Sequence, residues 1–132
     1  DAGKHWGGYV GGYGGGLVWV KARKDIEIEG MVNANGGACT PAEGGGGAGG
    51  GILFTCRALK GGGSITANGG NCNNGGSGGG GRIAVWTVNL AFDTNRVNAV
   101  SVAGGQSSNA IAGDGTIYWR MMPAYGTVLL LR

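Results

Sequence analysis

Short runs in which apolar and polar residues alternate recur along the chain and predict β-strands. Residues 25–29 read Asp-Ile-Glu-Ile-Glu, so both isoleucines point to one side of a strand and the acids to the other. Residues 17–22 alternate in the same way and are rich in residues that a pleated sheet favours. Apolar positions at helical spacing are not sustained over three turns anywhere. The pattern predicts an all-β protein.

A repeat organises these predicted strands. Residues 32–37 read Val-Asn-Ala-Asn-Gly-Gly, residues 65–70 read Ile-Thr-Ala-Asn-Gly-Gly, and a looser copy lies at 100–105. An apolar, β-rich stretch lies upstream of each copy, at 17–22, 52–58 and 83–88, and a fourth such stretch lies at 117–120. Each unit therefore reads strand, short link, strand and glycine-rich loop.

This repeat predicts a short parallel β-solenoid of about three to four coils, in which equivalent strands stack about 4.8 Å apart. The glycine runs 44–51 and 75–81 are expected to be ordered, either with positive φ at turns or extended at about 3.1 Å per residue with backbones packed together. Flexible linkers are the alternative for these runs. The competing fold is an antiparallel β-sandwich with polyglycine II segments, in which the Asn-Gly pairs at 35–36 and 68–69 form hairpin turns.

Most of residues 15–120 resembles the glycine-rich β repeats of large bacterial surface proteins and of some phage tail proteins. The resemblance rests on Gly-Gly-Ile-Leu-Phe-Thr at 50–55, on Gly-Ser-Ile-Thr-Ala-Asn-Gly-Gly at 63–70 and on Gly-Arg-Ile-Ala-Val at 81–85. The closing Gly-Asp-Gly-Thr-Ile-Tyr-Trp at 113–119 is similar to the ends of such repeat blocks. The resemblance implies an extracellular structural or adhesive role and supplies no catalytic residues.

Composition narrows the possible classes of protein. The chain has 34 glycines among 132 residues, but it is 42% hydrophobic and only 13% charged, whereas disordered chains are poor in apolar residues and strongly charged. We expect a glycine- and aromatic-rich N-terminal segment at 1–16 and a single β-repeat domain at 17–132. The net charge of +3 comes from scattered basic residues, so we expect no nucleic-acid partner.

The sequence also gives an expectation about the compartment of the protein. No apolar run approaches the 18 residues that cross a bilayer, so we expect no membrane insertion. The chain begins at Asp1, which indicates either a processed N-terminus of a secreted precursor or a fragment. The sequence therefore predicts an extracellular or cell-surface protein.

The three cysteines are distinguished by their places in the repeat. Cys39 and Cys72 both lie two residues after Asn-Gly-Gly, so adjacent coils bring their Cα atoms within the range that a disulfide accepts. A Cys39–Cys72 disulfide is the prediction, and two free thiols are the alternative. Cys56 lies among apolar neighbours and is expected to be a buried, inert thiol, with an intermolecular link as the other reading. Four zinc ligands are not assembled, so no metal or cofactor is expected.

Candidate catalytic groups are sparse. The single histidine, His5, stands in the glycine-rich N-terminal stretch, where it has no evident serine and acid partners. Glu27 and Glu29 share one strand face and are expected to be its solvated side rather than a glycosidase pair. The sequence therefore predicts a protein without enzymatic activity.

Aromatic residues fall close to the first strand of each unit. We expect Trp19, Phe54, Trp86 and Trp119 to form a stacked ladder in the core, and an exposed platform for sugar rings is the alternative. A second aromatic set lies at the N-terminus and is expected to bury against a neighbouring subunit. Its members are Trp6, Tyr9 and Tyr13.

The chain also ends in an apolar strand candidate with an open edge. Its apolar residues are Val128, Leu129, Leu130 and Leu131. Together with low charge and a small core, this edge predicts an extracellular structural subunit that polymerises with itself into a fibre, sheath or surface layer. The alternative is an adhesin or receptor-binding module, such as a phage tail tip, that recognises a cell-surface glycan or protein.

Overall fold

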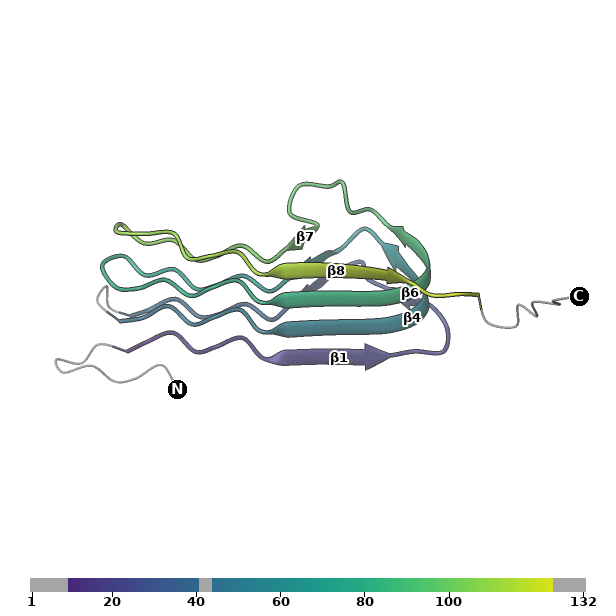
Figure 1. Cartoon of the computed structure of the whole chain (residues 1–132), viewed down its shortest axis with the longest axis horizontal. Coiled ribbons are helices and arrows are strands. Elements are labelled where there is room, and N and C mark those ends of the chain that lie inside the picture. The colour runs from purple at the N-terminus through teal and green to yellow at the C-terminus, as the bar shows by residue number, and fades with distance from the viewer. Residues whose placement is uncertain (1–9, 41–43, 125–132) are drawn as a thin grey trace, which may run out of the picture.

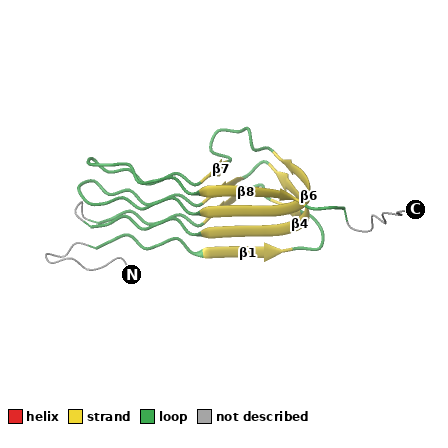
Figure 2. Cartoon of the chain, viewed as in Figure 1, coloured by secondary structure: helices red, strands yellow, loops and turns green. Residues whose placement is uncertain are grey.

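The computed structural model describes residues 10–40 and 44–124, which wind into a parallel β-solenoid of about three turns (Figure 1). These parts of the chain contain strands and loops and no helix (Figure 2). The strands are β1 (Leu17–Lys21), β2 (Ile26–Glu27), β3 (Met31–Asn33), β4 (Gly51–Gly61), β5 (Ser64–Thr66), β6 (Arg82–Phe92), β7 (Val100–Ser101) and β8 (Thr116–Met121). The predicted fold class is confirmed.

The turns build two sheets: the first turn contributes β1 and β2 to the larger sheet and β3 to the smaller, the next two contribute one strand to each, and β8 adds a last strand to the larger sheet. The larger sheet has the order β1-β4-β6-β8, with β2 beside the second half of β4, and the smaller has the order β3-β5-β7. All of these pairs are parallel, and Leu17, Gly51, Arg82 and Thr116 are successive partners across the larger sheet. Parallel pairing excludes the antiparallel sandwich, and the Asn-Gly pairs lie in extended segments that follow β3 and β5 rather than in hairpins.

The core lies between the two sheets because every second residue of the long strands points inward. Ile52 and Phe54 of β4 are each 2% exposed, and Ile65 of β5 meets them from the smaller sheet with no exposed surface. The buried cluster comprises Ile28, Ala34, Ile52, Phe54, Cys56, Leu59, Ile65, Ala67, Ile83, Val85, Phe92, Ala99 and Val102. Burial of β-branched and aromatic side chains on both sheets therefore supplies the hydrophobic stabilisation.

The predicted aromatic ladder is half wrong. Phe54 is buried and Trp119 packs against the core, but Trp19 is 67% and Trp86 is 37% exposed on the opposite face of the larger sheet. In the observed register Trp19 is aligned with Leu53, one residue before Phe54. A shift of one residue along a strand moves a side chain to the other face, so aromatics at similar places in the repeat face in opposite directions.

Glycine-rich segments extend each turn beyond the sheets and pack against one another (Figure 1). We call this region the glycine bundle. Its segments are 11–16, 44–50, 75–81 and 110–115, which lead into the long strands, and 34–39, 67–72 and 102–106, which leave the smaller sheet. The described part of the N-terminal segment is thus hydrogen-bonded into the solenoid, as Gly12 N–H donates to Gly45 O at 2.7 Å.

Hydrogen bonds leave these segments in three directions. Within residues 45–47, consecutive residues bond to Gly12, Gly76 and Gly37 of three different segments, at 2.7, 2.7 and 2.9 Å. A backbone that turns once every three residues, as polyproline II does, presents its polar groups in this way. The bundle is therefore a lattice of polyglycine II type, and the prediction that the glycine runs are ordered is confirmed.

Close approach of backbones is the reason for glycine here. A Cβ atom on Gly47 would lie 2.0 Å from Tyr13 O, and one on Gly78 would lie 1.9 Å from Gly47 O. Positive φ is not the requirement, because Gly61 is the only glycine in the described ranges with φ in that region, at 111°. Side chains occur where the lattice faces solvent, as at the exposed Ala48.

Asparagines border the bundle and join successive turns. Asn35 Oδ1 accepts a hydrogen bond from Asn68 N–H, and Asn68 Oδ1 accepts one from Ala103 N–H, both at 2.8 Å. Asn71 Oδ1 accepts in the same way from Gln106 N–H at 2.8 Å. This row lines a shallow hollow of about 470 Å³. Since its amide oxygens already accept backbone hydrogen bonds, we assign the row to the fold.

Two neighbouring glycines give a matched test of the lattice. We expect Gly78→Ala to lower the free energy of unfolding by about 3 kcal/mol or to prevent folding, because its Cβ has no space. In Gly79→Ala the nearest atom to the new Cβ is Gly113 O at 3.7 Å, so the change stays within about 1 kcal/mol and favours the folded state. Urea unfolding followed by circular dichroism measures both. Equal effects would contradict the packing argument.

Candidate functional site

The two ends of the stack present unpaired strand edges in the described parts of the chain. β1 is the outermost strand of the larger sheet at one end and β8 at the other (Figure 2). Neither strand has a partner on its outer side among residues 10–40 and 44–124. Soluble proteins usually shield such edges, because unpaired N–H and C=O groups can pair with another chain. The edges are therefore the candidate functional site.

The hydrogen bonds of β1 show which residues face its open edge. Gly51 N–H donates to Gly16 O at 3.0 Å, and Ala22 N–H donates to Thr55 O at 2.8 Å. Successive residues of a strand direct their polar backbone groups to alternate sides, so the even-numbered residues face β4. The N–H and C=O groups of Leu17, Trp19 and Lys21 consequently point away from the sheet.

The edge of β8 has the complementary arrangement. Thr116 N–H donates to Gly81 O at 3.0 Å and Met122 N–H to Thr87 O at 2.8 Å, so the even-numbered residues face β6. The backbone groups of Ile117, Trp119 and Met121 therefore face outward. All strands run parallel in one register, so the outward backbone groups of β8 are arranged like those through which β4 bonds to β6. The outward groups of β1 are arranged like those through which β6 bonds to β4. A β1 edge can therefore pair with a β8 edge in the way that neighbouring strands pair within the chain.

The predicted assembly residues have different outcomes. Tyr13 is described, and 73% of its surface is exposed on the first segment of the glycine bundle. The remaining residues lie outside the described ranges, so their role stays a prediction. They are Trp6, Tyr9, Val128, Leu129, Leu130 and Leu131. The sequence reasoning missed the edge residues of β1 and β8, because which backbone groups face outward depends on the pairing register.

The predicted disulfide between Cys39 and Cys72 is present, with Cα atoms 5.2 Å apart. Both residues lie on segments that leave the smaller sheet, and Cys39 N–H also donates to Asn71 O at 3.1 Å. The bond therefore links the first turn covalently to the second. Their shared place in the repeat was a sufficient signal, because stacked turns bring equivalent residues together.

Cys56 is a free thiol in the core and is 1% exposed. Its Sγ lies 3.8 Å from Thr87 Oγ1, and burial raises the pKa of the thiol. Within the described ranges, no group of three or more histidine, cysteine, aspartate or glutamate side chains is placed to hold a metal ion. Glu27 and Glu29 are both exposed.

An ion-pair cluster also joins the first two turns. Asp25 accepts hydrogen bonds from Arg57 Nε at 3.0 Å and lies 3.2 Å from Lys60 Nζ. The hydrogen bond from Arg57, followed by that from Lys60, lowers the pKa of the Asp25 carboxyl. Because the group is at the surface, we expect the cluster to orient the link after β1 more than to stabilise the fold.

Comparison of the chain with protein families, with characterised proteins and with solved structures finds no match. Among the described residues, no helix is long and apolar enough to cross a membrane.

Loss of the disulfide gives a quantitative test of the link between turns. We expect the double variant Cys39→Ser with Cys72→Ser to lose about 3 to 4 kcal/mol of unfolding free energy, because the unfolded chain regains the entropy of an open loop. Urea unfolding of parent and variant measures the difference. As a control, the double variant and the parent are both unfolded under reducing conditions. Their free energies of unfolding should then agree within about 1 kcal/mol. A large remaining difference would show that the serines themselves disturb the lattice.

The Cys56 thiol reports on opening of the core. We expect no reaction with iodoacetamide at pH 8 in the folded protein, since the group is inaccessible and its raised pKa keeps it protonated. Reaction should become complete in about 8 M urea, a concentration that unfolds most small domains. Mass spectrometry counts the labels, and rapid labelling of the folded protein would contradict the placement of Cys56 in the core.

The raised pKa of the Cys56 thiol also makes the free energy of unfolding depend on pH. The contribution of this thiol to stability is fully present below the pKa of the thiol in the unfolded chain, and it declines as the pH rises above that value.

Proposed function

We propose that this protein is an extracellular structural subunit that joins end to end, through the outer edges of β1 and β8, into a fibre. The observation that carries the proposal is that the two ends of the larger sheet present complementary parallel edges in the same register. A second copy placed on β8 through its own β1 continues the sheet by one more strand. Heterologous contacts of this kind do not close and produce filaments.

Backbone pairing supplies the main attraction at such a joint. The outward groups of Leu17, Trp19 and Lys21 meet those of Ile117, Trp119 and Met121 of the next copy. Each hydrogen bond contributes about 0.5 to 1.5 kcal/mol net. The inward side chains Val18 and Val20 are incompletely covered at the end of the stack and gain burial when another strand adds.

Two features confine the joint to the larger sheet. Tyr13 in the first turn is equivalent to Gly47 in the second turn. A Cβ atom at Gly47 would point toward the first turn, so the side chain of Tyr13 points toward the place where a neighbouring subunit would stack. At the other end, the loop after β6 rises beyond β7 (Figure 1). The glycine bundles of neighbouring subunits therefore stay further apart than turns within one chain, with Tyr13 between them.

The extracellular location is supported by the disulfide between Cys39 and Cys72. Such bonds persist in oxidising compartments and are rare in the cytosol of most organisms. An external fibre also benefits from a covalent link between turns, because it has no chaperones to restore an unfolded subunit.

Proline at each edge tests the joint. Leu17→Pro and Met121→Pro each remove an N–H that faces outward, so the ladder within the chain stays intact while the edge is blocked. We expect either variant alone to be monomeric by sedimentation velocity under conditions in which the parent polymerises. An equimolar mixture should form dimers and stop there, because each variant keeps one usable edge of opposite kind.

Matched controls separate backbone from side-chain effects. Leu17→Ala shortens the same exposed side chain but keeps the N–H, and should polymerise like the parent. Far-UV circular dichroism verifies that both proline variants remain folded. A parent that is monomeric at all concentrations overturns the proposal, and dimers of Leu17→Pro alone would show that β8 edges pair with each other instead.

A further inference from the structure

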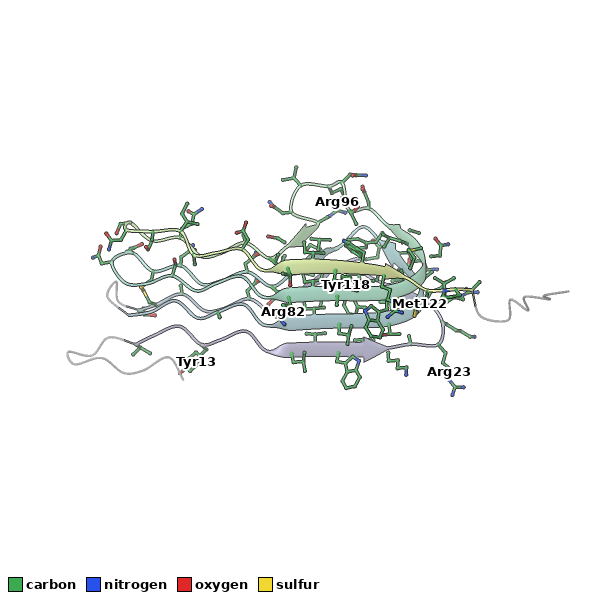
Figure 3. All side chains as sticks on the ribbon, viewed as in Figure 1. Tyr13, Arg23, Arg82, Arg96, Tyr118 and Met122 are labelled. Atoms are coloured by element: carbon green, nitrogen blue, oxygen red, sulfur yellow. A yellow bond between two sulfur atoms is a disulfide. The ribbon has the colours of Figure 1, made fainter. Side chains whose placement is uncertain are left out.

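The outer face of the larger sheet carries exposed aromatic and basic side chains in rows across the strands. One row is Trp19, Leu53, Ala84 and Tyr118, and the next is Lys21, Thr55, Trp86 and Arg120. Trp19 is 67% and Tyr118 is 56% exposed, and Figure 3 shows Tyr118 and Arg82 on the same side of the sheet. We call this surface the outer face.

Trp86 and Arg120 interact within this face. The Arg120 guanidinium carbon lies 5.4 Å from the centroid of the Trp86 ring on the neighbouring strand. This cation–π contact pairs an apolar ring with a planar cation on β6 and β8, at one end of the face.

Basic residues that are scattered in the sequence gather on this side of the molecule. Every lysine and arginine in the described ranges except Arg96 lies on the outer face or in the links that border it. They are Lys21, Arg23, Lys24, Arg57, Lys60, Arg82 and Arg120. The neighbouring acids are Asp25, which is paired with Arg57 and Lys60, Glu27, which lies beside Lys60, and the exposed Glu29. Cations therefore outnumber acids on this side of the molecule.

A hollow at one end of the face concentrates this charge. It measures about 400 Å³ and is lined by Lys21, Ala22, Arg23, Thr55 and Arg57. The Lys21 and Arg23 cations at this hollow suit a sulfate or carboxylate group, which accepts charge-assisted hydrogen bonds, while Arg57 is already engaged by Asp25. Trp19 precedes Lys21 on the same face of β1, so an aromatic platform adjoins the hollow.

We propose that the outer face binds an acidic polysaccharide, with sugar rings stacked on Trp19 and Tyr118 and acidic groups held by Lys21, Arg82 and Arg120. Sugar rings have apolar C–H faces that pack on aromatic rings, and sulfate or uronate groups match guanidinium geometry. A platform of aromatics and cations also suits single-stranded nucleic acid. The Cys39–Cys72 disulfide favours the polysaccharide, because it indicates an oxidising, extracellular setting.

The experiment compares four polymers of similar length by biolayer interferometry: dextran sulfate, polygalacturonate, neutral dextran and poly(U) RNA. We expect one of the two acidic polysaccharides to bind more tightly than both dextran and poly(U), and their comparison distinguishes sulfate from carboxylate recognition. The Met121→Pro protein is measured beside the parent, so that the result does not depend on whether subunits polymerise.

Variants test whether the face itself makes the contact. Trp19→Ala and Tyr118→Ala should each weaken binding about tenfold, while Tyr13→Ala, an equally exposed aromatic on the glycine bundle, should change it less than about twofold. Arg82→Gln should weaken binding about fivefold, and Arg82→Lys, which keeps the charge but loses the planar guanidinium, should weaken it by a smaller factor. Circular dichroism confirms that each variant is folded.

Several results overturn the proposal. Tighter binding of poly(U) assigns the face to nucleic acid, and equal binding of neutral dextran removes the role of charge. Binding that is insensitive to Trp19→Ala and Tyr118→Ala and vanishes near 0.5 M NaCl, about where surface charges are screened, shows uniform ionic association only. A change in self-association on Trp19→Ala in the Met121→Pro background would mark the face as a contact between copies.

Discussion

Contact between backbones without intervening side chains is the constraint on which this fold depends. In the glycine bundle a carbonyl oxygen occupies the space that a Cβ atom would need, at 1.9 Å from the ideal position at Gly78. Because every segment offers hydrogen-bonding groups in three directions, each segment is fixed by several neighbours at once. This fixes the register before the chain enters β4 and β6, so the long strands begin already aligned. Glycine, which usually loosens a chain, here orders it, since the lattice satisfies the backbone groups that the missing side chains leave accessible.

The solenoid therefore has two different means of stabilisation side by side. Between the sheets, apolar side chains such as Phe54 and Ile65 are withdrawn from water, and in the bundle hydrogen bonds and close packing replace them. The division explains a composition that is both rich in glycine and rich in apolar residues. Within residues 10–40 and 44–124 it also leaves the outer side of the larger sheet without a covering layer, because the core needs only its inner side. Residues there are released from packing and are available for contacts with other molecules.

Much of the fold could be predicted from the sequence, because the repeat records which residues stack. The copies at 32–37 and 65–70 place Cys39 and Cys72 at equivalent positions, and stacking then implies the bond. The repeat does not record which way a side chain faces. Trp19 and Phe54 are both aromatic residues in the first long strand of their turn. Their positions in the register differ by one residue, so their side chains lie on opposite sides of the sheet. For the same reason, Lys21, Arg82 and Arg120 are scattered along the chain but gather on one face, and this clustering was invisible until the pairing of strands was known.

The covalent link between the first two turns has a mechanical consequence. Hydrogen bonds between turns run along the axis of the stack, so a pulling force on a fibre acts directly on them. Cys39–Cys72 crosses the junction of the first and second turns, whereas the second and third turns are joined in the described chain by hydrogen bonds and side-chain packing. In the fibre proposed above, the disulfide would therefore hold the first two turns of each subunit together under tension, and extension would begin at junctions held by hydrogen bonds and packing alone, within or between subunits.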